Sequence, residues 1–300
     1  MKYLLIYNPK SGKQKFYKKV PKIKKYFDKM NLSLDIYASS DIEELMNKGE
    51  QAASIYDVII VSGGDGTINL IVNGIMKSKI KPIIAVLPSG TANDIAATLG
   101  MGRRIKRNLN LITKQSPVKM DVNMLNDKYF VYTTAAGIFT RISYDVPRKN
   151  IRRFGYFAYL YAGAKDIFRK YPLKMKIESE EGIHEDEYML VLGLSSRRVG
   201  GMFLNRFSNS KLNDGKFELR LFKNNNFFRI LKLVLFFISA GLYKTSKDIH
   251  LESSYFKIQA NEDVVWNIDG EKGYLGNVEI KVIKEALPVI VSKRRKKQFF

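Results

Sequence analysis

The residues best suited to chemistry form a short glycine-rich turn with one acid inside it. Ser62-Gly63-Gly64-Asp65-Gly66-Thr67 follows the apolar run Val58-Ile59-Ile60-Val61 and precedes the apolar-periodic stretch 68–75. A strand that ends in glycines and opens a helix brings backbone N–H groups close to phosphate. A carboxylate beside phosphates repels them unless a divalent cation lies between, so Asp65 indicates metal and nucleotide chemistry.

Three further polar stretches occur at plausible spacing around this turn. They are Asn8-Pro9-Lys10-Ser11-Gly12-Lys13, Leu87-Pro88-Ser89-Gly90-Thr91-Ala92-Asn93-Asp94 and Asn267-Ile268-Asp269-Gly270-Glu271. The glycine turn alone resembles the diacylglycerol kinase catalytic domain, sphingosine kinases, NAD kinases and, more remotely, phosphofructokinases. All four stretches together resemble the bacterial soluble diacylglycerol kinase and YegS-type lipid kinase family, over nearly the whole chain.

The elements around these motifs alternate between strand and helix in the first part of the chain. Short apolar runs predict strands at 3–7, 33–38, 57–61 and 82–87, and amphipathic stretches predict helices near 14–30, 41–54 and 67–78. Ser40 and Glu43 fit a capping box for the second helix. This alternation predicts an α/β domain with a parallel sheet, whose strands would end at one common cleft.

From about residue 118 the pattern becomes rich in strands. Candidate strands lie at 118–124, 128–136, 172–179, 186–194, 216–223, 254–260, 263–268 and 277–283, which predicts a mainly antiparallel β-sandwich. We expect an N-terminal nucleotide-binding α/β domain over 1–122 and a C-terminal lipid-substrate domain over 123–286. The resemblance implies that the tail, about 287–300, returns to the first domain, although an end in Gln298-Phe299-Phe300 also fits a frayed terminus.

The nucleotide phosphates would be held by backbone donors, hydroxyls and one flexible cation. Lys13 suits a β- or γ-phosphate, and Asn8 suits the ribose or the loop backbone. Each turn could also be an ordinary connection between a strand and a helix. The predicted nucleotide-binding residues are Asn8, Ser11, Gly12, Lys13, Gly63, Gly64, Asp65, Gly66, Thr67, Gly90, Thr91 and Asn93.

Carboxylates from separate segments would supply the metal ligands. Asp65, Asp94 and Asp121 make most sense as a magnesium-linked network if the fold brings them together, while Asp94 could instead stabilise a helix N-terminus. Asp214, in Leu212-Asn213-Asp214-Gly215-Lys216, resembles the family's structural magnesium loop, with Asn213 where an acid is usual. An Asn-Asp-Gly turn also forms between strands without any metal.

Phosphoryl transfer to an alcohol needs a base, because the hydroxyl proton must leave as the phosphorus–oxygen bond forms. The resemblance implies that Glu271 is this base, with Gly270 allowing a close turn and Asp269 supporting it; a plain hairpin turn is the alternative. Asp65 completes the predicted catalytic pair. The chain departs from the family pattern at Leu70, Ala97 and Ala162, which concerns the phosphate contacts and the lipid preference more than the reaction.

The composition indicates an acidic partner surface and no disulfides. The chain has 300 residues, 45% of them hydrophobic, no cysteine and a formal net charge of +22. Basic clusters at 103–107, 148–153 and 293–297 suit an anionic membrane surface. No motif that reads nucleic acid is found, and a lysine-rich composition could also just solvate the surface.

The longest apolar stretch, Phe227 to Leu242, is interrupted by Arg229 and Lys232 and falls short of a membrane span. It predicts a helix packed on a sheet. The alternative is a helix lying in the membrane interface, with Phe236, Phe237 and Leu242 inserted. The aromatic stretch 156–161 and the segment 135–139 could line an acyl groove, although core packing explains such residues more often.

The family resemblance implies a kinase that uses ATP and Mg²⁺ to phosphorylate diacylglycerol to phosphatidic acid. We expect it in the cytoplasm, transiently at the inner face of the cell membrane, with an exposed sheet edge that leaves a homodimer open. Alternatives are another lipid alcohol such as phosphatidylglycerol or monoacylglycerol, an NAD kinase, or a nucleotide- or membrane-binding regulator without turnover. The three stretches that begin at Asn8, Leu87 and Asn267 argue against NAD kinase, which shares only the glycine turn.

Overall fold

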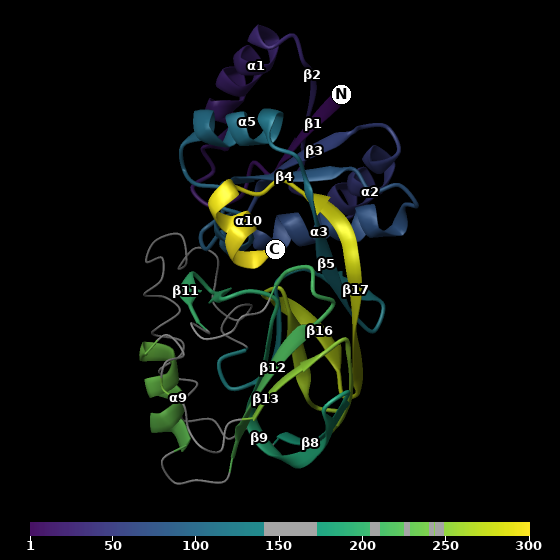
Figure 1. The fold of residues 1–300 in the computed structure, drawn as a ribbon, viewed down its shortest axis with the longest axis vertical. Helices are drawn as coiled ribbons and strands as arrows, with labels where there is room; N and C mark the ends of the chain where they lie inside the picture. Colours follow the sequence, from purple (N-terminus) through teal and green to yellow (C-terminus); the bar gives the residue numbers. More distant parts are fainter. Residues whose placement is uncertain (141–172, 205–210, 225–228, 240–242, 244–248) are drawn as a thin grey trace. The chain divides into compact units, whose positions relative to one another are not determined.

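A computed structural model of the chain describes residues 1–140, 173–204, 211–224, 229–239, 243 and 249–300 (Figure 1). The chain forms two compact units, residues 1–122 with 284–300 and residues 123–283. It passes from one unit to the other in strand β5 (Val118–Leu125) and returns in β17 (Val278–Val289).

A parallel sheet forms the centre of the first unit, in the order β17-β4-β3-β1-β2. β3 is buried along its whole length, which explains why its residues are continuously apolar rather than alternating. Among the strands of the described residues, β2 pairs with β1 alone and is an edge strand. The strands that precede β5 are β1 (Lys2–Tyr7), β2 (Ser33–Ala38), β3 (Val58–Gly63) and β4 (Ile83–Pro88).

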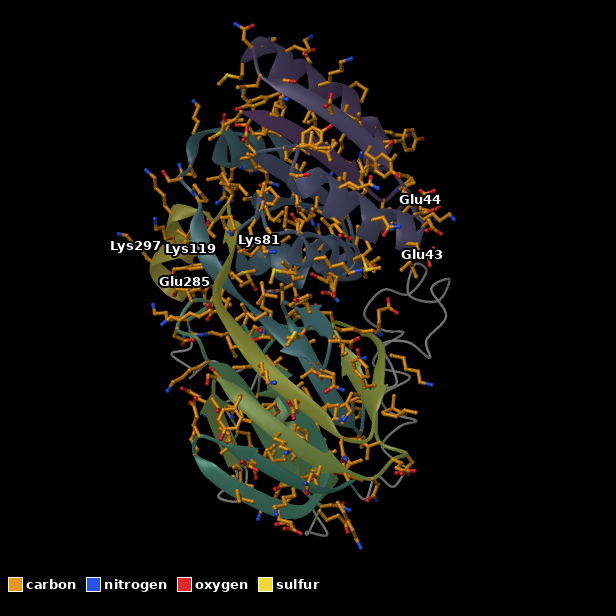
Figure 2. All side chains as sticks on the ribbon, turned by 90° about the vertical axis from the view of Figure 1, so that its right-hand side faces the viewer. Glu43, Glu44, Lys81, Lys119, Glu285 and Lys297 are labelled. Atoms are coloured by element: carbon orange, nitrogen blue, oxygen red, sulfur yellow. The ribbon has the colours of Figure 1, made fainter. Side chains whose placement is uncertain are left out.

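Helices of the first unit form two layers (Figure 1). α2 packs along α3, and α1 contacts α5, where the Tyr26 hydroxyl donates to Asn110 Oδ1 at 2.7 Å. At the end of α3, Lys81 Nζ donates to the carbonyl oxygens of Ile75 and Met76, both at 3.1 Å (Figure 2). The elements are η1 (Phe16–Lys19), α1 (Val20–Lys29), α2 (Ile42–Ala53), α3 (Asp65–Lys77), α4 (Asp94–Thr98), α5 (Ile105–Lys114) and α10 (Lys293–Phe299).

The capping of α2 differs by one residue from the prediction. Asp41, not Ser40, is the N-cap, and its Oδ1 accepts from the backbone N–H of Glu44 at 2.9 Å. Glu44, rather than Glu43, bonds back toward the start of the helix through the Ser39 hydroxyl (Figure 2). Serine and aspartate are both good N-cap residues, and the bond from the Glu44 N–H assigns the cap to Asp41.

The C-terminal helix α10 is packed in the first unit and is not frayed. The Ser292 N–H donates to the Leu99 carbonyl at 3.0 Å, and Phe299 is buried. One apolar anchor therefore holds a helix whose other side chains are mostly basic.

The second unit is antiparallel and rich in strands, as predicted for its fold class. Its strands follow the order β16-β15-β7-β9-β8-β14-β17, with β12 joining β9 to β13 and β6 joining β5. Strands far apart in this order share one core that includes Phe130, Phe217 and Trp266, so the sheet curves around it. The remaining strands are β6 (Lys128–Phe130), β7 (Thr133–Gly137), β8 (Leu173–Ser179), β9 (Gly182–Leu194), β10 (Arg198–Val199), β11 (Met202–Phe203), β12 (Phe217–Lys223), β13 (Ile249–Ser253), β14 (Tyr255–Ala260), β15 (Val265–Ile268) and β16 (Glu271–Leu275).

The apolar helix α9 (Arg229–Ile238) packs on protein, as the first of the two interpretations predicts. Leu233 and Phe236 are buried in a cluster with Phe222 and residues of β9, and the Phe222 and Phe236 rings lie 5.0 Å apart. Insertion of Phe236 into a membrane is therefore wrong, because its ring is already covered. In the described part of the chain, no helix has the length and apolar character needed to span a bilayer.

Several predicted features lie outside the described residues. They are the basic cluster 148–153, the aromatic stretch 156–161, Ala162 and Leu242. The segment 135–139 is described, and Ala135, Ile138 and Phe139 belong to the cluster that α9 covers, so core packing explains them.

Replacing Leu233 by alanine should destabilise the second unit by about 2–5 kcal/mol, because it opens a cavity under α9. The matched control is Leu231→Ala in the same helix, where the side chain is 54% exposed and the change should stay within about 0.5 kcal/mol. Trp266 is the single tryptophan and is buried in this unit, so its fluorescence during urea unfolding measures both variants. Equal effects of the two substitutions would contradict this packing.

Candidate functional site

Three loops meet where β1, β3 and β4 end, at the carboxyl edge of the parallel sheet. The Asn8 N–H donates to the Ser62 carbonyl at 2.9 Å, and the Gly90 N–H donates to the Gly63 carbonyl at 3.1 Å. The Asn8 amide also donates to Thr67 Oγ1 at 3.3 Å. The structure therefore brings together the first three predicted motifs, which sequence order alone keeps about 25 to 80 residues apart.

Backbone rather than side chain forms the contact between these loops. A Cβ atom on Gly90 would lie 2.4 Å from the Gly64 Cα, and one on Gly12 would lie 2.1 Å from the Ser89 carbonyl oxygen. Gly12 also adopts a φ of +52°, which favours glycine. Any side chain at these positions would push the loops apart, so the glycines are needed for the loops to meet.

Polar side chains fix the shape of each loop. The Ser11 hydroxyl accepts from the Gly64 N–H at 3.3 Å. Asn93 adopts a left-handed conformation, and its amide group both accepts from the Gly90 N–H at 2.7 Å and donates to the Gly90 carbonyl at 2.8 Å. Ser11 and Asn93 thus hold the turns, and their side chains already bond to backbone groups of the loops.

Two predicted residues extend away from this network. Lys13 and Thr91 are exposed, whereas Gly64, Asp65 and Gly66 are half-buried and Thr67 is buried. Lys13 directly follows the Gly12 turn, and its long side chain carries an exposed ammonium group. An exposed cation next to a preorganised loop is suited to a phosphate that arrives from solvent.

The carboxylates of Asp65 and Asp94 lie close enough to influence each other. Asp65 begins α3, and its Oδ1 accepts from the backbone N–H of Ile95 at the start of α4, at 2.9 Å. Burial raises the pKa of Asp65 to about 6, the bond from Ile95 opposes this, and the nearby Asp94 charge raises it further. Asp94 is fully buried at the N-terminus of α4. A site with two adjacent carboxylates suits a hard divalent cation.

Asp121 lies on β5 and has a structural partner. Its Oδ1 accepts from the backbone N–H of Glu285 in β17 at 2.6 Å, and the side chain is buried. Beside it, Lys119 and Glu285 form an exposed ion pair at 3.8 Å (Figure 2). The described contacts of Asp121 therefore join the outgoing and returning strands of the first unit.

In the second unit, Glu271 begins strand β16 directly after a tight turn. Asp269 and Gly270 both have positive φ, +48° and +91°, which is the pattern of a type I′ hairpin turn. The buried Asp269 carboxylate accepts from the N–H groups of Thr133 at 2.8 Å and Val131 at 3.2 Å. Asp269 thus supports the turn, as the resemblance implies, and Glu271 is exposed at its exit.

Asp214 organises its own loop. Its Oδ2 accepts from the Lys211 N–H at 3.1 Å and its Oδ1 from the Lys216 N–H at 3.0 Å. The carboxylate is exposed, and it lies in the second unit, whereas Asp65, Asp94 and Asp121 belong to the first. These bonds account for the turn before β12.

Two serines outside the predicted site residues also contribute to the loop edge. The Ser62 hydroxyl donates to the Ser89 hydroxyl at 3.1 Å, which links the ends of β3 and β4. Each serine directly precedes the first glycine of its loop, and this shared position is the sequence signal for the pair.

Comparison with known proteins decides the family. The diacylglycerol kinase catalytic domain matches residues 2–125. The diacylglycerol kinase of Staphylococcus aureus (strain MRSA252) is 31% identical over 271 residues, which cover 90% of this chain and 85% of that protein. The chain belongs to the diacylglycerol kinase family. It is therefore a lipid kinase, and the loops of the first unit lie inside its matched catalytic domain.

Further relatives of this kinase cover its whole length. The diacylglycerol kinase of Bacillus subtilis (strain 168) is 28% identical over 296 residues, or 98% of this chain and 97% of that protein. A crystal structure from Bacillus anthracis str. Sterne has a TM-score of 0.81 and 25% identity, and covers 98% of both chains. The Glu271 turn lies outside the matched domain, but within the length shared with these relatives.

Replacing Asp65 by asparagine should stabilise the metal-free first unit at pH 8, by on the order of 1–2 kcal/mol. The pKa of Asp65 is raised to about 6 from 3.8, so the folded protein binds its proton more tightly than the unfolded chain. Stability therefore falls as pH rises from 4 through 6, and the penalty is fully present above pH 6. Thermal unfolding in chelator measures the difference between the variant and the wild type.

The gain should shrink toward pH 4, where the wild-type carboxyl is protonated in both states. Asp28→Asn is the control, because it removes the same charge from an exposed position in the same unit. A gain that is equal for both variants, or one that persists unchanged at pH 4, would show that burial of Asp65 is not its cause.

Proposed function

We propose that this lipid kinase transfers the terminal phosphoryl group of ATP to the hydroxyl of diacylglycerol, giving ADP and phosphatidic acid. The observation that carries the proposal is the meeting of three glycine-containing loops beside the Asp65–Asp94 pair. The names of the relatives supply the acceptor class. In this proposal the first unit binds the nucleotide and the second unit binds the lipid.

Backbone N–H groups and hydroxyls at the loop edge bind the ATP phosphates. Gly66 and Thr67 offer donors at the start of α3, where the helix N-terminus also favours anions, and Gly63 and Gly64 leave the approach to them free of side chains. Ser11, Gly12, Gly90 and Thr91 line the same edge, and the exposed Lys13 reaches a β- or γ-phosphate. Asn8 and Asn93 act by holding the loops through their bonds to Thr67 and Gly90.

Asp65 and Asp94 are the residues that fit a Mg²⁺ ion. Their carboxylates lie close enough to repel each other, and a divalent cation between them would remove that repulsion. When bound, Mg²⁺ neutralises phosphate charge as the phosphoryl group is transferred. Asp121, bonded to the Glu285 backbone, would act with them only through water, and Asp214 would hold a separate structural ion.

Glu271 serves as the general base. Its carboxylate accepts the proton of the lipid hydroxyl while the hydroxyl oxygen forms a bond to the γ-phosphorus. The bond from that phosphorus to the bridging oxygen of ADP breaks, and the released electron pair stays on ADP. The hairpin turn supports this role, because Asp269 and Gly270 fix the backbone from which the Glu271 side chain extends.

Two basic clusters of the first unit would bind the anionic membrane surface. Residues 103–107 follow α4, and α10 carries Lys293, Arg294, Lys296 and Lys297. The Ser292–Leu99 hydrogen bond places the start of α10 beside the end of α4, so the clusters approach each other. Each exposed basic residue near an anionic membrane contributes on the order of 1 kcal/mol, which supports transient recruitment from the cytoplasm.

The edge of β2 supports a homodimer, since one side of this strand has no partner among the described strands. Sedimentation of the full chain measures the oligomeric state. A monomer at micromolar concentration would remove this part of the proposal and leave the kinase chemistry untouched.

Phosphate transfer from labelled Mg·ATP to diacylglycerol in mixed micelles tests the activity. Glu271→Gln should lower kcat by roughly 10²–10⁴-fold with little change in nucleotide affinity, because only proton removal is lost. Glu262→Gln is the matched control, an exposed glutamate in the same unit, and should keep full activity. Joint loss of turnover and nucleotide binding in the Glu271 variant would assign Glu271 a structural role.

Parallel assays decide the acceptor. Label in phosphatidylglycerol or monoacylglycerol instead of diacylglycerol would keep the mechanism and change the substrate. Absence of label in any lipid, with ATP still bound, would favour a regulator without turnover.

Gly90→Ala should abolish binding of Mg·ATP, since its Cβ would meet the Gly64 backbone and separate the two loops. Gly102→Ala is the control, because a Cβ there has its nearest neighbour at 3.9 Å. Calorimetric titration of each purified variant measures the affinity. Retention of nucleotide binding by the Gly90 variant would contradict the placement of the phosphates on this edge.

A further inference from the structure

One face of the β12–β13 pair carries four charged side chains. The strands are antiparallel, with Glu218 opposite Glu252 and Arg220 opposite His250. Residues directly opposite each other in such a pair lie on the same face of the sheet. Two carboxylates in this relation repel each other, so a cation between them would stabilise the pair.

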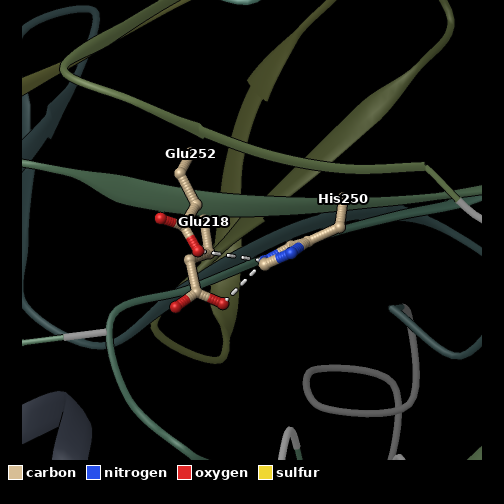
Figure 3. Close-up of side chains that lie close together, drawn as sticks. All are labelled: Glu218, His250 and Glu252. Carbon is tan, nitrogen blue, oxygen red and sulfur yellow. Dashed lines mark hydrogen bonds and ion pairs between the residues drawn. The ribbon is translucent and has the colours of Figure 1, made fainter. Parts of the chain in front are cut away.

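The imidazole of His250 faces both carboxylates, which lie together on one side of it (Figure 3). Its Nε2 is 2.9 Å from Glu218 Oε2 and 3.8 Å from Glu252 Oε1, and the three ligand atoms all lie within 4.8 Å of one another. Ligands bound to one zinc ion at about 2.0–2.2 Å are separated from each other by roughly 3.0–3.5 Å. Small side-chain movements would therefore place all three atoms on one metal ion.

The burial of these side chains differs in a useful way. Glu218 is 4% exposed, whereas His250 and Glu252 are 33% and 40% exposed. A buried carboxylate is costly unless a positive charge compensates it. The cluster thus has one fixed ligand inside and two ligands that solvent, and an ion from solvent, can reach.

The cluster lies on the face of β12 that α9 covers. Phe222, two residues beyond Arg220, packs against Phe236 of α9, while Leu219 and Leu221 point into the opposite core. The Arg220 guanidinium carbon lies 5.8 Å from the centre of the Phe236 ring. In the part of the chain that the structure describes, β13 pairs with β12 alone, so this face is at an edge of the described sheet.

We propose that Glu218, His250 and Glu252 bind one divalent transition-metal ion of the zinc class. Imidazole together with carboxylates suits Zn²⁺, whereas Mg²⁺ prefers oxygen ligands only. The ion joins the edge strand β13 to β12 and so closes the stretch of chain, residues 224–248, that carries α9 between them. Its role is structural, and it is independent of the nucleotide site, which belongs to the other unit.

The chain offers a matched control because it has only two histidines, His184 and His250. His184 lies on β9, opposite Ile177 of β8. The imidazole signals of the two residues are therefore assigned by one substitution in a heteronuclear NMR spectrum. Millimolar Mg²⁺ throughout keeps the carboxylate sites of the first unit from taking up the probe.

ZnCl₂ titrated into the full chain should bind with a stoichiometry of one and shift the His250 signals, leaving those of His184 in place. His250→Gln should weaken the affinity by at least about 10-fold, since loss of even an outer partner of a metal ligand costs about 10–100-fold. His184→Gln should leave it unchanged. Zn²⁺ should also raise the unfolding temperature of the wild type and not that of His250→Gln.

Glu252→Gln provides a second test that does not depend on the buried half of the cluster, because Glu252 is exposed. It should weaken Zn²⁺ binding while the protein stays folded. Absence of stoichiometric binding, or equal affinity in wild type and His250→Gln, would overturn the proposal and leave Glu218 and His250 as an ion pair alone.

Discussion

The contact between the backbones of Gly64 and Gly90 sets the geometry on which the first unit depends. With 2.4 Å between a Cβ on Gly90 and the Gly64 Cα, the Gly90 loop has no room for another residue type at that point. The ends of β3 and β4 therefore meet backbone to backbone, and the Ser62–Ser89 hydroxyl pair lies beside them. This close approach keeps Cβ atoms out of the junction, so backbone rather than side chains sets the shape of the loop edge.

At the same edge, a hydrogen bond that stabilises the fold is opposed by an unfavourable charge on Asp65. The Asp65 carboxylate accepts from the Ile95 N–H and thereby stabilises the start of α4, yet its burial and the neighbouring Asp94 raise its pKa to about 6. Stability alone would favour a neutral side chain here. A carboxylate with a raised pKa beside a second acid is a common property of functional sites.

In the second unit, a curved antiparallel sheet positions one exposed glutamate, Glu271, and one apolar helix, α9. The Asp269 carboxylate fixes the turn before Glu271 through two backbone bonds. On another face, Leu233 and Phe236 of α9 pack with Phe222, so an apolar stretch that resembles a membrane-interface helix is used for packing. The same face of β12 and β13 also carries the charged residues Glu218, Arg220 and His250. Glu218 is buried there, so its carboxylate needs a positively charged partner.

The sequence predicts the local chemistry because each motif consists of a few consecutive residues. The continuous apolar stretch 58–61, followed by three glycines and an acid, predicts a buried parallel strand and a phosphate-binding turn without any knowledge of the fold. The fold class and the lipid kinase family followed from four such runs. Helix caps were less certain, since Ser40 and Asp41 are both good N-caps and only the observed bond to the Glu44 N–H separates them.

Tertiary structure decided everything that depends on which distant segments meet. Burial of Phe236, anchoring of α10 through Phe299, and the Asp121–Glu285 bond all require a partner that is remote in sequence. The Glu218–His250–Glu252 cluster has no local signature, because its spacing arises from the register of β12 on β13. Sequence determines what each segment offers, but the free energy of burial and pairing, which depends on the whole fold, determines which groups come together.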